Sequence, residues 1–160
     1  MTATRVDDIL TYLVAAAQAA QATTLAGVTV QDGPWPAAYV VTDTAFLIVG
    51  GDWEPTAPAD SVSSTQTASS MGNNSVVEAL TVRCAAVSQS GDTDMAARRA
   101  QAVAIVEAVE GLVTADPKLG GLLQEAAVLS VDSLRQEQRG GGAYCAVNFT
   151  ISASALIWNG

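Results

Sequence analysis

Two segments of the chain repeat apolar residues at helical spacing. Within Thr4–Gln21 and again within Thr93–Thr114, apolar side chains recur every three or four residues, which places them on one stripe of a helix. Asp92 and Asp94 stand where the second helix would begin, and Pro117 follows its end. The pattern therefore predicts two amphipathic helices. Their stripes consist of Val6, Ile9, Leu10, Leu13, Ala17 and Ala20 in the first, and Ala102, Ile105, Val106, Val109, Leu112 and Val113 in the second.

Other segments carry the patterns of strands. The clearest is Cys145–Ile157, in which apolar and polar residues alternate. Thr44–Val49 is a continuous apolar run, typical of a strand that is covered on both faces or lies near a subunit contact. Less regular patterns predict three more strands, at Val28–Gln31, at Val76–Ser88, and across Ala127, Leu129 and Val131. The order of elements predicts an α+β fold, with two helices packed on one face of a largely antiparallel, four- to five-stranded sheet.

Residues 52–75 interrupt this regular pattern. Proline-containing sequence is followed there by a run dominated by serine and threonine. Because long stretches without regular structure are uncommon inside compact domains, we interpret this segment as a flexible loop or as a loop that becomes ordered on a partner. The whole chain, residues 1–160, is long enough for one domain and too short for two independent cores.

Charge and composition narrow the possible functions. The chain has 16 acidic and 7 basic residues, hence a net charge of −9, and it contains no histidine. The absence of histidine excludes Ser-His and Cys-His nucleophilic pairs and histidine-ligated metals. A strongly acidic chain is also a poor candidate for binding nucleic acid through its phosphates. These properties argue against most enzymes and most DNA-binding proteins, and we expect no enzymatic activity and no cofactor.

Hydropathy and the first residues bear on the cellular setting. No apolar run reaches the length of about 18 residues that a membrane helix needs. Asp7 and Asp8 stand where a signal peptide would carry basic residues. We therefore expect a chain that folds in a cytoplasm, with Cys84 and Cys145 reduced and no contact with a membrane.

The residues with chemical potential have simpler explanations. Cys84 and Cys145 fall on the apolar faces of predicted strands, which favours buried thiols over an adjacent redox-active pair. Glu107 and Glu110 are three residues apart on a helix but lie opposite its apolar stripe, as expected for a solvated face. The glycine pairs and the glycine triplet match no phosphate-binding loop. No catalytic, cofactor-binding or metal site is predicted.

Three features point instead to contacts between proteins. Arg98 and Arg99 lie near the start of the second helix, where the helix dipole disfavours cations, so they are either scattered surface charges or contacts to an acidic neighbouring subunit. Trp35 and Trp53 flank a turn and the 52–75 loop, and either pack beneath the loop or serve as interface anchors. The polar segment Arg135–Gly142, which contains Arg139, is either a hairpin end or an arm that contacts a neighbour.

The order and texture of these elements resemble the tail-terminator and tail-completion proteins of long-tailed bacteriophages. The resemblance rests on the opening helix Val6–Leu13, the Asp32–Trp35 turn and the middle strand Val76–Ser88. It continues through the helix around Ala96–Ala100 and the closing strands around Leu129–Asp132 and Ala146–Thr150, and covers most of the chain except the 52–75 loop.

The resemblance implies a structural role in a virion. Members of the family form a ring, usually of six copies, on the last ring of the tail tube, where they stop polymerisation and offer a surface to the head-side connector protein. The chain would then reside at the head-proximal end of the tail and in the host cytoplasm during assembly. DNA would pass through the ring without specific binding, and we expect the surplus acids to line part of the lumen and repel its phosphates. Candidate interface residues are Trp35, Trp53, Arg98, Arg99, Arg135 and Arg139, the four arginines as partners of acidic neighbours.

Three other functions remain open. The first is another role in the same assembly, such as a head-tail connector, a neck protein or a tube protein. The second is a monomeric α+β module that binds a small molecule, which predicts an apolar pocket. The third is an enzyme that uses only carboxylate or hydroxyl side chains.

Overall fold

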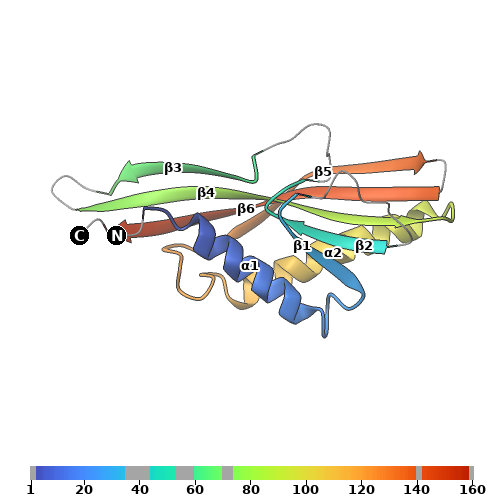
Figure 1. The fold of residues 1–160 in the computed structure, drawn as a ribbon, viewed down its shortest axis with the longest axis horizontal. Helices are drawn as coiled ribbons and strands as arrows, with labels where there is room; N and C mark the ends of the chain where they lie inside the picture. The colour runs from blue at the N-terminus through green and yellow to red at the C-terminus, as the bar shows by residue number, and fades with distance from the viewer. Residues whose placement is uncertain (1–2, 35–43, 53–59, 70–73, 140–141, 159–160) are drawn as a thin grey trace.

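The computed structural model describes residues 3–34, 44–52, 60–69, 74–139 and 142–158, which form two helices and six strands (Figure 1). In chain order the elements are α1 (Val6–Ala20), β1 (Val28–Asp32), β2 (Thr44–Val49), β3 (Val62–Ala68), β4 (Ser75–Ser90), α2 (Met95–Ala115), β5 (Val128–Arg139) and β6 (Gly142–Trp158).

The six strands form one sheet built around the long antiparallel pair β4 and β6. The strand order is β1-β2-β4-β6-β5, and β3 also pairs with β4. Strands β3 and β2 lie one after the other along the same margin of β4, opposite Val76–Val82 and Cys84–Gln89. Strand β5 lies on the other margin, along β6. Of the strand pairs in the described residues, only β1 and β2 run parallel, so the predicted α+β class with a largely antiparallel sheet is confirmed.

Both helices lie on the same side of the sheet (Figure 1), and the main core fills the space between them and the strands. On β6, the residues that face the helices are the predicted apolar series from Cys145 to Ile157, and all of them are buried. The helix stripes meet this surface through Ile9, Leu13 and Ala17 of α1 and through Ile105 and Val109 of α2, among others. Helical periodicity on one side and strand alternation on the other thus produce a two-layer core.

A smaller core lies on the opposite face of the sheet, where β2, β4 and β6 run side by side. Its residues are Phe46, Ile48, Ala85, Val87, Tyr144 and Ala146. Phe46 and Ile48 alternate along β2 with Leu47 and Val49, which face the helices. Strand β2 is therefore buried on both faces, as one of the two interpretations of its apolar run predicted.

Strand β3 lies within the segment that the sequence predicted to be a loop. Residues 52–75 were expected to lack regular structure, but Val62–Ala68 form a strand in register with β4, and the sheet has six strands instead of four to five. Serine, threonine and glutamine dominate this strand, so no apolar alternation indicated it. Residues 53–59 and 70–73 of the predicted loop lie outside the described residues.

The described residues of Arg135–Gly142 agree with the interpretation of this segment as a hairpin end and not with a projecting arm. Arg135–Arg139 continue β5, and Gly142 opens β6. The next residue, Ala143, lies opposite Ser90 at the end of β4, and its N–H donates to the carbonyl of Asp92 at 2.7 Å. Because the hairpin ends level with β4, its described residues form a sheet margin and not an arm that projects from the body.

Glu78 anchors the start of α1 on the sheet. Its carboxylate accepts hydrogen bonds from the backbone N–H of Arg5 at 2.8 Å and from the Thr4 hydroxyl at 2.5 Å. The hydroxyl of Ser64, on β3, donates to the same carboxylate at 2.8 Å. Burial of Glu78 opposes its ionisation, but hydrogen bonds from Thr4, Arg5, Ser64 and Gln66 outweigh that effect and lower its pKa. One buried anion therefore joins the helix start, β4 and β3.

Candidate subunit interface

The two cysteines are packing residues, as the sequence suggested. Cys84 lies opposite Phe149, four residues along β6 from Cys145, or about 13 Å at the usual rise per residue. Both thiols are free and buried. Burial raises the pKa of Cys84 to about 12 and also raises the pKa of Cys145. Both side chains therefore stay protonated at neutral pH and act as small apolar groups.

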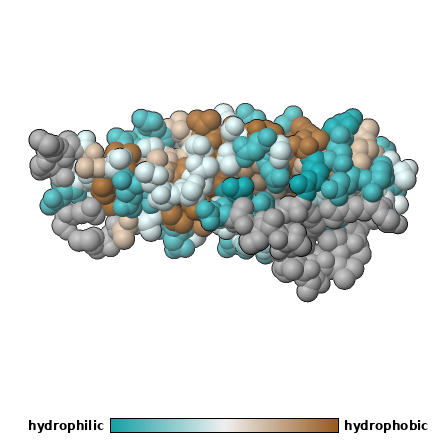
Figure 2. Space-filling model, turned by 90° about the horizontal axis from the view of Figure 1, so that it is seen from above, coloured by the Kyte–Doolittle hydropathy of each residue, from teal (hydrophilic) through white to brown (hydrophobic). Residues whose placement is uncertain are grey.

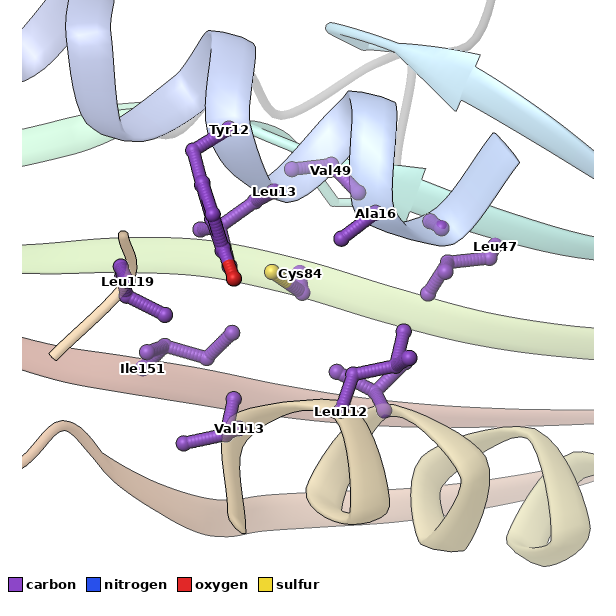
Figure 3. Close-up of a pocket in the computed structure, with 12 residues that line it drawn as sticks. Tyr12, Leu13, Ala16, Leu47, Val49, Cys84, Leu112, Val113, Leu119 and Ile151 are labelled. Carbon is purple, nitrogen blue, oxygen red and sulfur yellow. The ribbon is translucent and has the colours of Figure 1, made fainter. Parts of the chain in front are cut away.

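A small apolar cavity lies between the two helices and the sheet (Figure 3). Its volume is about 20 Å³, close to the space needed by one water molecule, and aliphatic side chains such as Leu47, Leu112 and Ile151 line it together with Cys84. The side chain of Tyr12 borders it, but its hydroxyl donates to Asp116 at 2.6 Å. The cavity is too small for the ligand that a small-molecule-binding module would need.

The carboxylate of Asp116 joins α1 to the turn that follows α2. It accepts hydrogen bonds from the Tyr12 hydroxyl and, at 2.8 Å, from the N–H of Gly120. The hydrogen bond to Asp116, burial and the negative charge of Asp116 together raise the pKa of Tyr12 to about 12. Because Tyr12 serves as a donor to an anion, the pair holds the two helices in place and is not arranged for proton transfer at neutral pH.

The carboxylates that the sequence analysis considered as a pair lie on the solvent side of α2. Glu107 and Glu110 are exposed on α2, as predicted for a solvated face. In the described part of the chain, no group of three or more acidic or cysteine side chains is placed to hold a metal ion. No helix there is long and apolar enough to cross a membrane.

The predicted interface arginines are distributed over one end of the molecule. Arg99, at the start of α2, donates to the side chain of Gln136 on β5 at 2.7 Å. Arg98 reaches Gln101 at 3.4 Å, and the Ser88 hydroxyl donates to the same Gln101 oxygen at 2.5 Å. These contacts fix the first turns of α2 against the sheet and leave Arg99 exposed beside β5.

The other predicted interface residues are not brought together with Arg99. Arg135 is exposed on β5, but it lies opposite Ala146 and therefore belongs to the sheet face away from the helices. Arg139 is the last residue of β5. Trp35 and Trp53 lie outside the described residues. The role of all these side chains in subunit contacts stays a prediction.

An exposed apolar strip lies beside Arg99, and the sequence analysis did not identify it. Val131 and Leu134 share the helix face of β5, because they lie opposite the core residues Phe149 and Val147. Val103 follows Arg99 by one turn on the flank of α2 that meets β5. Their exposed fractions are 56% for Val131, 42% for Leu134 and 37% for Val103. We refer to Val103, Val131 and Leu134 as the β5 strip.

The irregular spacing of apolar residues in the β5 strip explains why the apolar pattern of the sequence did not predict it. The register shifts between Val131 and Ser133, so Asp132 forms a bulge and the next apolar residue on the same face is Leu134. Strict alternation from Leu129 would have placed Ser133 on that face. Val131 belongs to the predicted strand across Ala127, Leu129 and Val131, but β5 lies at the margin of the sheet, where α2 covers it only in part.

Comparison with known proteins gives a likeness to solved structures but not to a family. No family model matches the chain, and no curated protein is significantly similar to it. Among solved structures, a chain of the virion of a native gene transfer agent particle is similar, with a TM-score of 0.48 and 12% sequence identity. The likeness covers 90% of this chain and 92% of that chain, and by itself it assigns no role.

Proposed function

We propose that this chain is a structural subunit of a phage-type virion, and that it acts as a tail terminator. Copies of it would form a ring on the end of the tail tube, stop the growth of the tube and present a surface to the head. The observation that carries the proposal is the β5 strip, an exposed apolar surface with an arginine at its border on an otherwise acidic protein.

The position of the β5 strip suits contacts that close into a ring. The strip lies at one margin of the sheet, on the flank of α2. If it contacts a different surface of the next copy, the contact is heterologous, the type of contact that generates rings. Burying Val103, Val131 and Leu134 in it would remove their exposed apolar area from water.

Charge favours an acidic surface as the partner of the strip. Arg99 lies at the border of the strip, whereas acidic residues such as Asp7, Asp8 and Glu110 are exposed on the helices. Copies with a net charge of −9 repel one another, so a contact that pairs arginine with acidic side chains reduces that repulsion where the copies meet.

Deletion of the gene for this chain from the genome that encodes the virion tests the terminator role. Loss of the subunit should give tails of unregulated length that lack heads, as seen by electron microscopy. Tails of normal length without heads would contradict a terminator and indicate a connector role. Normal virions would contradict any structural role in head-tail joining.

Variants of β5 test whether the strip makes the ring contact. Leu134→Asp places a charge in the strip, whereas Ser130→Asp places the same charge on the same strand but on the other face, opposite Thr150. Both positions are exposed, so both variants should fold. We expect a gene encoding Ser130→Asp to restore normal virions and one encoding Leu134→Asp to fail. If both variants restored normal virions equally well, the β5 strip would not be part of the ring contact.

A further inference from the structure

Strand β3 forms an open edge of the sheet. Among the described strands it pairs with β4 alone, on one side, and all of its residues after Val62 are exposed. In Figure 1 it lies along the upper margin of the sheet, away from both helices. An edge strand presents unpaired backbone N–H and C=O groups that are ready to pair with another strand.

The other two margins carry features that discourage strand addition, and β3 carries none. Strand β5 has the bulge at Asp132 and the charged residues Arg135, Glu137 and Arg139. Strand β1 has only five residues, and the carbonyl of Val28 accepts a hydrogen bond from the side chain of Gln21. Strand β3 has no charge, no proline and no bulge over seven paired residues. Proteins that remain monomeric usually blunt such an edge.

Hydrogen bonds to the rest of the molecule hold β3 in place. Ser64 donates to the buried carboxylate of Glu78, and the side chain of Gln66 donates to the carbonyl of Ala3 at 2.8 Å. The backbone continues the ladder at both ends, because Arg83 N–H donates to Ser61 and Ser69 N–H donates to Ser75. A strand that is already ordered loses little conformational entropy when a partner binds.

The ladder also determines which backbone groups point outward. Ser61 and Ser69 bond to β4, and hydrogen-bonded and non-hydrogen-bonded positions alternate along an antiparallel strand. The odd-numbered residues of β3 therefore direct their N–H and C=O groups toward β4. The even-numbered residues direct theirs away from the sheet, and these are Val62, Ser64, Gln66 and Ala68.

We propose that β3 pairs antiparallel with β3 of a second copy of this chain across a two-fold axis at Thr65. In this register Ser64 lies opposite Gln66 of the other copy and Val62 lies opposite Ala68, so the outward N–H and C=O groups of each pair face one another. Thr65 lies opposite its own equivalent at a non-hydrogen-bonded position, where side chains approach closely. Cross-strand threonine pairs are favourable. The pairing thus uses every outward group of β3.

The lack of charge on β3 makes it an edge at which a second copy meets little repulsion. Copies with a net charge of −9 repel one another, and β3 offers a surface on which no charge must be buried or placed beside a like charge. The sequence of β3 is also similar in both directions from Thr65, with serine or threonine at positions 63 and 67. When this strand pairs with its own copy, each residue therefore lies opposite a residue of similar size or polarity.

The sheet face next to β3 would extend the contact into a continuous neutral surface. Cross-strand rows on the face away from the helices contain uncharged residues: Thr67, Val77 and Leu156 in one row, and Thr65, Ala79 and Ser154 in the next. Figure 2 shows the molecule from above, where hydrophobic and weakly polar residues alternate with hydrophilic ones over the part that is not grey. Pairing of two copies would join their β6-β4-β3 sheets into one. This inference does not depend on the proposed function, because it uses a different edge from the β5 strip.

A charge substitution at the two-fold axis tests the pairing. Thr65→Lys would place two ammonium groups opposite each other, whereas Thr29→Lys makes the same change at an exposed position of β1. Sedimentation velocity over a range of concentrations should show a monomer–dimer equilibrium for the wild type and for Thr29→Lys. The dissociation constant of Thr65→Lys should be roughly tenfold higher or more. Equal thermal unfolding midpoints of the variants would show that their folds are intact.

Disulfide trapping tests the register. The native thiols are buried, so an introduced cysteine is the reactive one. Thr65→Cys should form an intermolecular disulfide with itself under mild oxidation, because its Cα would lie within disulfide range of its equivalent. Ser63→Cys alone should not, but a mixture of Ser63→Cys and Thr67→Cys should give the mixed dimer. Thr29→Cys is the control for random collision.

The two experiments can each overturn the proposal. A wild-type chain that stays monomeric at every concentration, or a dimer that Thr65→Lys leaves unchanged, would contradict it. Equal trapping of Thr65→Cys and Thr29→Cys would also contradict it. A ring of wild-type copies that tolerates Thr65→Lys but not Leu134→Asp would support the proposed function and reject this inference.

Discussion

The side chain of Glu78 accepts a hydrogen bond from the backbone N–H of Arg5, although the two residues are 73 positions apart in the chain. This contact places a negative charge at the start of α1, where the helix has unsatisfied N–H groups and a positive dipole end. The side chain of Glu78 is completely buried. A charge inside a small domain is tolerated only where hydrogen bonds compensate for its lost hydration, and here the donors come from β3 and from the two residues that precede α1.

Glu78→Gln should destabilise the fold markedly. The substitution keeps the shape of the side chain but removes its charge and replaces one carboxylate oxygen with an NH₂ group, which faces either the Arg5 N–H or the Thr4 and Ser64 hydroxyls. We expect the free energy of unfolding, measured by urea denaturation, to fall by roughly 2–3 kcal/mol. Glu107→Gln, at an exposed position of α2, should change it by less than about 0.5 kcal/mol. A similar small change in both variants would contradict the role of Glu78.

Acid should destabilise the wild type through the same residue. Hydrogen bonding lowers the pKa of Glu78 in the folded state below its ordinary value, despite the opposing effect of burial. Its contribution to stability is therefore complete above the unfolded-state pKa, about 4.3, and is lost as the pH falls through the folded-state value. The difference in unfolding free energy between wild type and Glu78→Gln should shrink as the pH is lowered from neutrality through that range. A difference that stays constant with pH would contradict the prediction.

The Tyr12–Asp116 hydrogen bond gives an opposite dependence at alkaline pH. Because the pKa of Tyr12 is raised to about 12, its contribution to stability is complete below the unfolded-state pKa of about 10 and is lost as the pH rises toward 12. Tyr12→Phe should cost roughly 1 kcal/mol at neutral pH, and this cost should decrease above pH 10. Unfolding free energies of the two proteins at several alkaline pH values measure it. Tyr12→Phe with wild-type stability at neutral pH would be the contrary result.

The two cysteines should report on opening of the core. Cys84 and Cys145 are buried with raised pKa values, so a thiol reagent such as Ellman's reagent should react with neither in the folded protein and with both after denaturation. Release of the coloured product, followed by absorbance, measures this. Immediate reaction of one thiol under native conditions would show that the two-layer core is open at that residue.

The sequence determined the elements whose stability comes from apolar periodicity. The stripes from Val6 to Ala20 and from Ala102 to Val113 predicted α1 and α2, and alternation from Cys145 to Ile157 predicted β6. The apolar run at Thr44–Val49 also predicted a strand, either covered on both faces or near a subunit contact, and the structure has a strand there that is buried on both faces. These features are local, because a helix or strand that buries one face must repeat apolar residues at its own period.

The tertiary structure alone decided what depends on residues distant in sequence. Strand β3 has no apolar pattern, and it forms because β4 supplies its hydrogen bonds and Glu78 binds Ser64. The β5 strip is exposed because β5 occupies a margin and a bulge at Asp132 changes its spacing. Periodicity records which side of an element is apolar, but strand order decides which apolar side is covered and which edge stays open. The candidate interfaces of this protein arise from that second choice, and for that reason the sequence did not reveal them.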